Sequence, residues 1–364
     1  MELRSNKPWV QVRINGSAPQ TFILDSGCAI GSVVARECAD RLRFGLGAGT
    51  RRNLGAGEGV SVAVTSMPDV TLDAGGDTLH VPRVGVFPLA HVSPYEGRRV
   101  DGLLGADFLG RNVVELDYAH RSVRTFDPAT FAYAGPGTSI PITLEAGLVV
   151  AEGAIAPPGG TPIPCRFVVD TGVRATVIVY HPFTVAHALV GTQPRVLTAT
   201  VGGGAGGETK GDVGRLDSLR IGGVVIARPT AIFSRDTAGV FAGTRQDAIV
   251  GGELLRRFTV ILDCAHGRMI LEPNAGTGAP FDYDMSGLFL VSPGPDFRRV
   301  VIQSVAQGTP GAGAGLEKGD EIVRVNGREA ARMTLDDVRA ALMRAGGECR
   351  LEVQHAGARR EVTL

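Results

Sequence analysis

The hydrophobic positions of the chain fall mainly into short alternating or wholly apolar runs separated by glycine-rich turns. Residues 9–14 (WVQVRI) alternate as a half-buried strand does, and residues 21–25 return as a second strand after an Asn-Gly turn at 15–16. Residues 33–42 (VVARECADRL) have helical spacing and contain neither Gly nor Pro, so they predict a short helix. The many short strands predict a mainly β protein.

Two of the predicted strands end in the same way. Residues 22–27 read FILDSG and residues 167–172 read FVVDTG, so each apolar run stops at an acid, a hydroxyl residue and a glycine. The acids, Asp25 and Asp170, lie 170 − 25 = 145 residues apart. The glycine permits backbone angles that other residues avoid. Two such turns brought together would place two carboxylates side by side.

A second pair of segments repeats at nearly the same interval. Residues 101–120 read DGLLGADFLGRNVVELDYAH, and residues 247–266 read DAIVGGELLRRFTVILDCAH. Gly105 and Gly251 each follow two apolar residues and lie 251 − 105 = 146 residues apart. The matching offsets indicate a tandem duplication of one unit over residues 1–274, with the halves paired about a pseudo-two-fold axis.

Composition narrows the class of protein. A length of 364 residues suggests two or three domains, and 51 glycines with 5% aromatic residues suit a turn-rich β protein. Lys+Arg and Asp+Glu both number 37, which argues against a nucleic-acid partner. The lack of an 18-residue apolar run predicts no membrane-spanning helix and no retained signal peptide. The compartment stays open between the cytoplasm and, if an export signal was removed, the cell envelope or periplasm.

The cysteines and histidines do not predict a metal site. The five cysteines are scattered without a CxxC or CxxH pair, which favours isolated buried thiols, and no histidine has metal-ligand spacing. The glycine run at 201–207 (VGGGAGG) lacks the Lys-Ser/Thr ending of a phosphate-binding loop. The sequence therefore predicts neither a metal nor a cofactor.

The paired motifs resemble those of retropepsin-like and pepsin-like aspartic proteases, in a single-chain form of bacterial type. The resemblance covers about three quarters of the chain and rests on two Asp-Ser/Thr-Gly motifs in register with two apolar-apolar-Gly motifs. It implies a bilobal, pseudo-two-fold, mainly antiparallel β fold with one or two short helices per lobe. It also implies that the glycine-rich turn at 45–59 is a flap over a cleft, and the similar run at 201–207 fits a flap hinge or a plain disordered loop.

The resemblance also implies roles for individual residues. Asp25 and Asp170 are the expected catalytic pair, and they share a proton because two adjacent carboxylates do not both ionise readily. Support for the active-site loops is expected from two hydroxyl residues and four glycines: Ser26, Gly27, Thr171, Gly172, Gly105 and Gly251.

The chain departs from the protease pattern at three places. Cys28 and Val173 stand where these proteases usually have Ala, and Ala106-Asp107 stands where retropepsins have an arginine. These changes leave both carboxylates in place and bear on how the loops around them are supported.

The pattern changes after a linker at 273–280 (PNAGTGAP). The sequence GLEKGDEI followed by VNG resembles a bacterial PDZ domain, over nearly all of residues 281–364. The resemblance implies that residues 335–344 form a helix beside a groove for a peptide with an apolar C-terminus. It further implies that one segment turns its backbone N–H groups toward the peptide's terminal carboxylate: Gly287, Leu288, Phe289 and Leu290.

We therefore expect a first protease lobe at 1–135, a second lobe at 136–274 and a PDZ domain at 281–364. The favoured function is an aspartic endopeptidase that hydrolyses peptide or protein substrates with a water activated by the Asp25/Asp170 dyad. One alternative is a catalytically silent peptide-binding or scaffold protein that works through the PDZ domain. A homodimer of retropepsin-like units is the other, and the presence of both acids in one chain favours a monomer instead.

Overall fold

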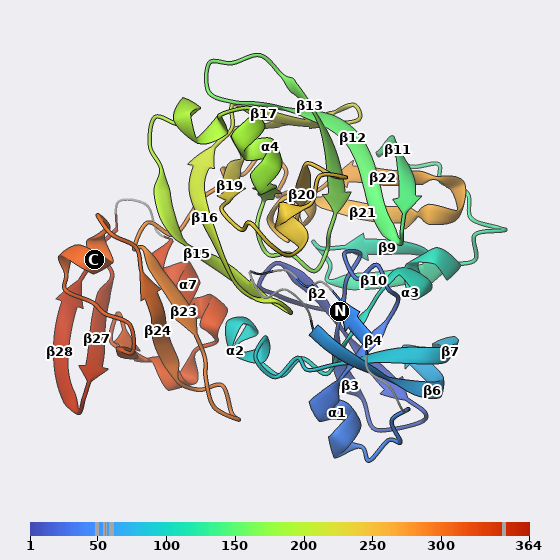
Figure 1. Cartoon of the computed structure of the whole chain (residues 1–364), viewed down its shortest axis with the longest axis horizontal. Helices are drawn as coiled ribbons and strands as arrows, with labels where there is room; N and C mark the ends of the chain where they lie inside the picture. Colours follow the sequence, from blue (N-terminus) through green and yellow to red (C-terminus); the bar gives the residue numbers. More distant parts are fainter. Residues whose placement is uncertain (48–50, 54, 56, 58–61, 344–346) are drawn as a thin grey trace.

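The computed structural model describes residues 1–47, 51–53, 55, 57, 62–343 and 347–364. Figure 1 shows two lobes, blue to cyan and green to yellow, with an orange to red C-terminal domain beside them. Strands dominate all three parts because short β-branched and aromatic runs alternate with glycine turns. The mainly β fold class predicted from the sequence is confirmed.

The first lobe is built on an eight-stranded sheet with the order β1-β2-β3-β8-β4-β7-β6-β5. The sheet curls, since β2 pairs with β6 as well as with β3. The elements of this part of the chain are β1 (Glu2–Arg4), β2 (Lys7–Ile14), β3 (Gln20–Leu24), β4 (Val33–Ala35), α1 (Arg36–Arg41), β5 (Arg51–Asn53), β6 (Val62–Ala74), β7 (Asp77–Phe87), α2 (Ser93–Glu96), β8 (Gly102–Leu104), α3 (Ala106–Arg111), β9 (Val113–Asp117) and β10 (Ser122–Phe126).

The second lobe contributes most strands of a larger sheet that also includes β9 and β10. Its elements are β11 (Thr138–Glu145), β12 (Leu148–Ala156), β13 (Ile163–Val169), β14 (Val177–Val179), α4 (His181–Ala186), η1 (Leu189–Thr192), β15 (Leu197–Gly204), β16 (Gly207–Arg215), β17 (Ser218–Ile221), β18 (Val224–Ala227), β19 (Thr230–Ser234), η2 (Val240–Ala242), β20 (Ala248–Val250), α5 (Gly252–Leu255), β21 (Phe258–Asp263), η3 (Cys264–His266) and β22 (Arg268–Pro273).

The two lobes repeat the same strand pairings. In lobe 1, β8 pairs in parallel with β3 and antiparallel with β4. In lobe 2, β20 pairs in parallel with β13 and antiparallel with β14. The lobes are joined by β9 and β21, which are equivalent strands of the two repeats and pair antiparallel with each other. The predicted duplication about a pseudo-two-fold axis is confirmed.

The predicted helix at 33–42 is wrong in its first three residues. Residues Val33–Ala35 form strand β4, and the helix α1 begins only at Arg36. β4 is wholly buried between β7 and β8, and β-branched valines suit a strand in that position. Tertiary pairing therefore overrides the helical spacing of the sequence.

The C-terminal domain has a sheet of its own, with β23 at the edge in the order β23-β24-β25-β27-β28 and β26 paired to β25. Its helix α7 ends at Leu342, and Arg344 of the predicted helix lies outside the described residues. The elements are β23 (Leu288–Val291), β24 (Val300–Val305), α6 (Pro310–Gly313), β25 (Glu321–Val325), β26 (Arg328–Glu329), η4 (Ala330–Arg332), α7 (Leu335–Leu342), β27 (Arg350–His355) and β28 (Ala358–Thr363).

Arg257 of lobe 2 binds the segment that leads from lobe 2 to the C-terminal domain. The buried guanidinium of Arg257 donates to the carbonyls of Ala279 and Pro280 and lies 3.5 Å from the centre of the Phe281 ring. Phe281 packs into the core shared by the two lobes. Because of these contacts, the C-terminal domain starts from a fixed point on the protease lobes.

Candidate active site

Both acidic loops begin at the end of a buried strand that has a parallel neighbour. The Asp25 backbone N–H donates to the Leu104 carbonyl at 2.8 Å, and the Asp170 N–H donates to the Val250 carbonyl at 3.0 Å. Leu104 and Val250 directly precede the glycines of the apolar-apolar-Gly motifs. The parallel pairing therefore explains why each acid motif recurs with an apolar-apolar-Gly motif.

Two buried hydroxyl groups join the loops across the pseudo-two-fold axis. Ser26 Oγ donates to the Val169 carbonyl at 2.7 Å, and Thr171 Oγ1 donates to the Leu24 carbonyl at 2.6 Å. Each oxygen also accepts the backbone N–H of the other residue, from Thr171 at 3.0 Å and from Ser26 at 3.1 Å. All four groups are buried, so the bonds fix the two loops in one relative position.

The two carboxyl groups meet between these loops and are hydrogen-bonded to each other. Asp25 Oδ1 accepts the Gly27 N–H at 2.9 Å, and Asp170 Oδ1 accepts the Gly172 N–H at 2.8 Å. A Cβ atom on either glycine would collide with the carboxylate of the opposite lobe. Glycine is therefore required at both positions by the closeness of the carboxyl groups.

Burial raises the pKa of both carboxyl groups. For Asp170 the negative charge of Asp25 adds to the effect of burial, so its pKa lies well above the usual range. The pKa of Asp25 is also raised by burial and is then partly lowered by the positive charge of Lys7. Because Asp170 is only 8% exposed and lies against a second acid, the pair keeps one proton to higher pH than a free aspartate would.

Lys7 is a site residue that the sequence reasoning missed. It is 9% exposed at the start of β2, and its Nζ lies 2.6 Å from Glu96 Oε1. Its charge lowers the pKa of both dyad carboxyl groups. A lysine at the buried start of an alternating strand, KPWVQVRI, was the available signal.

Two of the departures from the protease pattern, Asp107 and Cys28, have structural explanations. Asp107 accepts hydrogen bonds from the Ser32 N–H at 2.7 Å and the Ser32 hydroxyl at 2.6 Å, which tie α3 to the loop after Asp25. The Cys28 thiol donates to the Gly31 carbonyl at 3.1 Å, and burial raises its pKa well above the usual value. Both residues therefore support the first acidic loop, and the thiol is neutral.

Glycine-rich segments from the two lobes meet each other. The β15–β16 hairpin carries the run at 201–207, and a Cβ atom built on Gly55 would lie 2.6 Å from the Gly206 nitrogen. A Cβ atom on Gly57 would lie 2.5 Å from the Gly207 carbonyl oxygen. Part of the segment predicted at 45–59 lies outside the described residues. The described glycines allow the predicted flap and the glycine run of the second lobe to touch.

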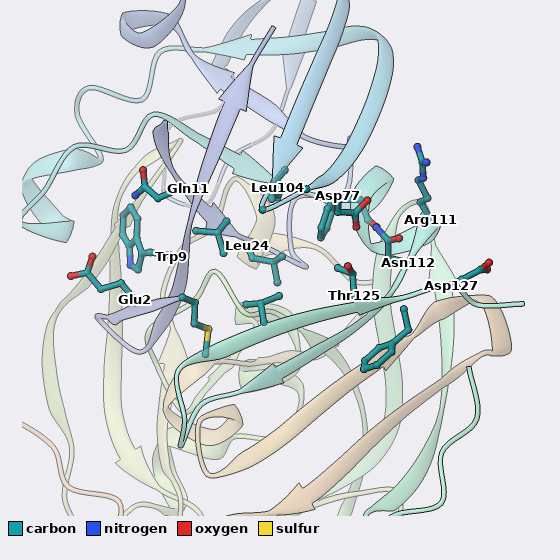
Figure 2. Close-up of a pocket in the computed structure, with 18 of the residues that line it drawn as sticks. Glu2, Trp9, Gln11, Leu24, Asp77, Leu104, Arg111, Asn112, Thr125 and Asp127 are labelled. Carbon is teal, nitrogen blue, oxygen red and sulfur yellow. The ribbon is translucent and has the colours of Figure 1, made fainter. Parts of the chain in front are cut away.

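A cavity of about 1170 Å³ opens elsewhere, between the lobe 1 sheet and β10. Figure 2 shows Glu2, Trp9 and Gln11 on one side of it, and Asn112 and Thr125 on the other. Neither dyad aspartate lines this cavity. The cavity is therefore separate from the chemistry of the two acidic loops.

The predicted peptide-binding segment of the C-terminal domain forms the edge strand β23 and the turn before it. Gly287 has a φ of +77°, and a Cβ atom there would collide with the Thr309 side chain. The side chains of Leu288 and Leu290 point into the core of this domain, and Phe289 alternates to the opposite face. Helix α7 packs beside β23 and starts with a capping box at Thr334.

Two features are absent from the part of the chain that the structure describes, a metal-binding cluster and a membrane-spanning helix. No group of three or more His, Cys, Asp or Glu side chains there is arranged to hold a metal ion. Among the same residues, no helix is both long enough and apolar enough to cross a membrane.

The fold and the paired carboxyl groups define a bilobal aspartic-protease architecture, and the comparison with known families agrees. The family model described as aspartyl protease matches residues 10–108 and 154–254, which is more than half of the chain. A PDZ domain model matches residues 289–354. The chain belongs to the aspartyl protease family and carries a C-terminal PDZ domain. A search of curated proteins finds no match.

Proposed function

We propose that this protein is an aspartic endopeptidase in which Asp25 and Asp170 activate one water molecule. The observation that carries the proposal is the hydrogen-bonded pair of carboxyl groups, buried at Asp170 and partly buried at Asp25, whose pKa values are both raised. A pair that holds one proton contains a base and an acid at the same place. The chemistry available to it is general acid–base hydrolysis.

The reaction follows from that shared proton. The ionised carboxylate accepts a proton from the water while the water attacks the scissile carbonyl carbon. The protonated carboxyl group donates to the carbonyl oxygen as negative charge develops there. The cross-lobe bonds of Ser26 and Thr171 hold both groups in place, so little reorganisation is needed during the reaction.

The two alternative functions are less well supported. A silent scaffold has no need for two adjacent carboxyl groups whose charged forms are disfavoured by burial and by each other. A homodimer of half-units is also disfavoured, because one chain supplies both acidic loops and both strands, β9 and β21, that join the lobes. We propose a monomer with the domain boundaries expected from the sequence, 1–135, 136–274 and 281–364.

The endopeptidase proposal is tested by incubating the purified full chain with a mixed peptide library at several pH values. We expect cleavage by the wild-type protein and none by Asp25→Asn or Asp170→Asn. Asp296→Asn is the matched control, because Asp296 is an exposed carboxylate in the PDZ domain. Cleavage that survives in both dyad variants would show that another group carries the activity.

We further propose that the PDZ domain binds peptides with a free apolar C-terminus through residues 287–290. The test compares cleavage of such a peptide with cleavage of its amidated twin, by the full chain and by Gly287→Ala. The added methyl group should distort the turn before β23 and remove any preference for the free terminus. Gly327→Ala is the control, since Gly327 also has a positive φ, of +80°, but faces open space.

A further inference from the structure

The peptide-binding edge of β23 is already in contact with another part of the chain. The Ser292 backbone N–H, just after β23, donates to the Pro94 carbonyl of α2 at 2.8 Å. The Leu290 carbonyl accepts Arg339 Nη2 at 3.1 Å. Residues two apart on a strand present their backbone groups to the same edge, and among the described residues β23 has no strand partner on this edge. Two groups that an added peptide strand would use are therefore engaged.

Helix α7, on the other side of the groove, contacts the same lobe 1 segment. Arg339 Nη2 also donates to the Tyr95 carbonyl at 2.8 Å, so this guanidinium connects α7, β23 and α2. The Arg339 side chain is only 11% exposed, and burial lowers its pKa to about 9. A Cβ atom on Gly97 would lie 2.7 Å from Leu335 Cβ. Residues 93–97, which we call the docked segment, thus lie between β23 and α7.

The start of α7 is held by a turn of lobe 1. The Ser5 N–H and hydroxyl both donate to the Asp336 carboxylate, at 2.6 and 3.0 Å. Arg339 Nη1 donates to the Ser5 hydroxyl at 3.2 Å. These polar contacts join the groove helix to lobe 1 independently of the docked segment.

The docked segment also joins the PDZ domain to the β15–β16 hairpin of lobe 2. The Tyr95 ring lies 5.9 Å from the Phe289 ring and packs directly on Gly203 of β15. Next to it, Gln303 of β24 donates to Glu208 of β16 at 2.6 Å. Figure 1 shows the β15–β16 hairpin reaching from lobe 2 to the region of α2. The hairpin that meets the lobe 1 glycines is therefore in contact with the PDZ domain.

We propose that the PDZ groove is an internal docking site for residues 93–97, and that its external partner is an extended peptide with a free apolar C-terminus that binds by displacing them. This inference rests on the proposed peptide binding by the PDZ domain. A peptide that adds as a strand to β23 needs the edge that Pro94 and Arg339 engage, so the two forms of the protein exclude each other. Displacement removes the Tyr95 contacts and leaves the Gln303–Glu208 bond, so the β15–β16 hairpin is held less firmly over the cleft and opens more readily.

The docked form has two consequences that can be measured. The apparent affinity for an external peptide equals the affinity of the open groove multiplied by the fraction of molecules in which the groove is open. Substrate access is reduced as well, because the hairpin is held against the PDZ domain. Since the docked segment also contains Glu96, the partner of Lys7, its displacement changes the surroundings of a charge that acts on the dyad.

The first experiment measures peptide binding in the full-length Asp170→Asn protein, which removes cleavage from the readout. The probes are fluorescein-labelled decapeptides ending in a free Ala, Val, Leu, Ile or Phe, measured by fluorescence anisotropy. Adding Tyr95→Ala is expected to tighten binding about two- to tenfold, because the loss of an aromatic pair weakens the docked form. Tyr133→Ala, a tyrosine that contacts Glu272 far from the PDZ groove, is the control and leaves binding unchanged.

The second experiment measures amide hydrogen exchange in the wild-type chain with and without the tightest of these peptides. We expect the peptide to speed exchange several-fold along β15–β16. The single change Gln303→Ala should speed hydrogen exchange of the same amides without changing the exchange of the Ser292 amide. It also serves as a second variant if Tyr95→Ala fails to fold. Unchanged exchange along β15–β16, both with the peptide and in Gln303→Ala, overturns the proposed coupling between the PDZ groove and the β15–β16 hairpin.

Equal binding by Asp170→Asn with and without Tyr95→Ala, or no binding by either protein, overturns the docking proposal. These results do not depend on catalysis. A wild-type chain that shows the expected binding and exchange but cuts no peptide would refute the endopeptidase function and leave the docking inference standing.

Discussion

The cross-lobe hydroxyl bonds can be tested by changing Thr171 to Val, which keeps the branched shape and removes only the hydroxyl. The Thr171 hydroxyl donates to the Leu24 carbonyl and accepts the Ser26 N–H, and every group involved is buried. In the variant, the Leu24 carbonyl and the Ser26 N–H both lose their hydrogen-bond partner at a site from which water is excluded.

The expected cost follows from those two groups. A buried polar group without its partner costs about 1–3 kcal/mol, so two such groups should lower the free energy of unfolding by about 2–6 kcal/mol. Domains are typically stable by about 5–15 kcal/mol, so the variant loses a large share of its stability. The dyad should also lose its fixed geometry, because the same bonds position both acidic loops.

Urea unfolding followed by tryptophan fluorescence measures this loss. Trp9 is the single tryptophan of the chain and is buried in lobe 1, so its emission reports on the protease body. Thr184→Val is the matched control, because the buried Thr184 hydroxyl has no hydrogen-bond partner among the described residues. If Thr171→Val lowers the urea midpoint no more than Thr184→Val, the cross-lobe bonds do not hold the lobes together as argued.

Three further predictions concern the dyad. Asp25→Asn or Asp170→Asn should each lower kcat/KM for peptide cleavage by about 10²–10⁴-fold in a quenched-fluorescence assay, as expected for loss of an acid–base group. Burial raises the pKa of Asp170 in the folded state, so the fold loses stability as pH rises above about 3.9, the pKa of an aspartate in the unfolded chain. The melting temperature of Asp170→Asn should therefore increase relative to that of wild type as pH rises. A difference that shrinks with rising pH contradicts this. Lys7→Met should shift the acidic limb of the pH–rate profile to higher pH, because the Lys7 charge lowers both dyad pKa values, while Lys7→Arg should keep it in place.

The sequence predicted that the two acidic loops come together, because this arrangement is encoded locally and twice. Each acid follows an apolar strand and precedes a hydroxyl residue and a glycine, and each apolar-apolar-Gly strand pairs beside it. Duplication carries further information, since equal offsets in two halves indicate a two-fold arrangement. In the structure, Asp25 and Asp170 are accordingly brought together, and the hydroxyls of the next residues, Ser26 and Thr171, are hydrogen-bonded to each other.

The same reasoning failed where local spacing and tertiary pairing disagree. Val33 and Val34 fit a helical pattern, yet they form a strand because β7 and β8 offer hydrogen bonds on both sides. The role of Asp107 was also hidden, since Ser32, its partner, lies 75 residues earlier in the chain.

By itself, the sequence determined the class of fold, the two acidic motifs and the PDZ domain, because strand periodicity, turn residues and repeated motifs are properties of short segments. Only the tertiary structure decided that Lys7 and Glu96 pair beside the dyad and that residues 93–97 lie in the PDZ groove. Those contacts join residues that are far apart along the chain, such as Pro94 and Ser292. No local pattern predicts them, because they depend on how surfaces of the two lobes and the PDZ domain pack together.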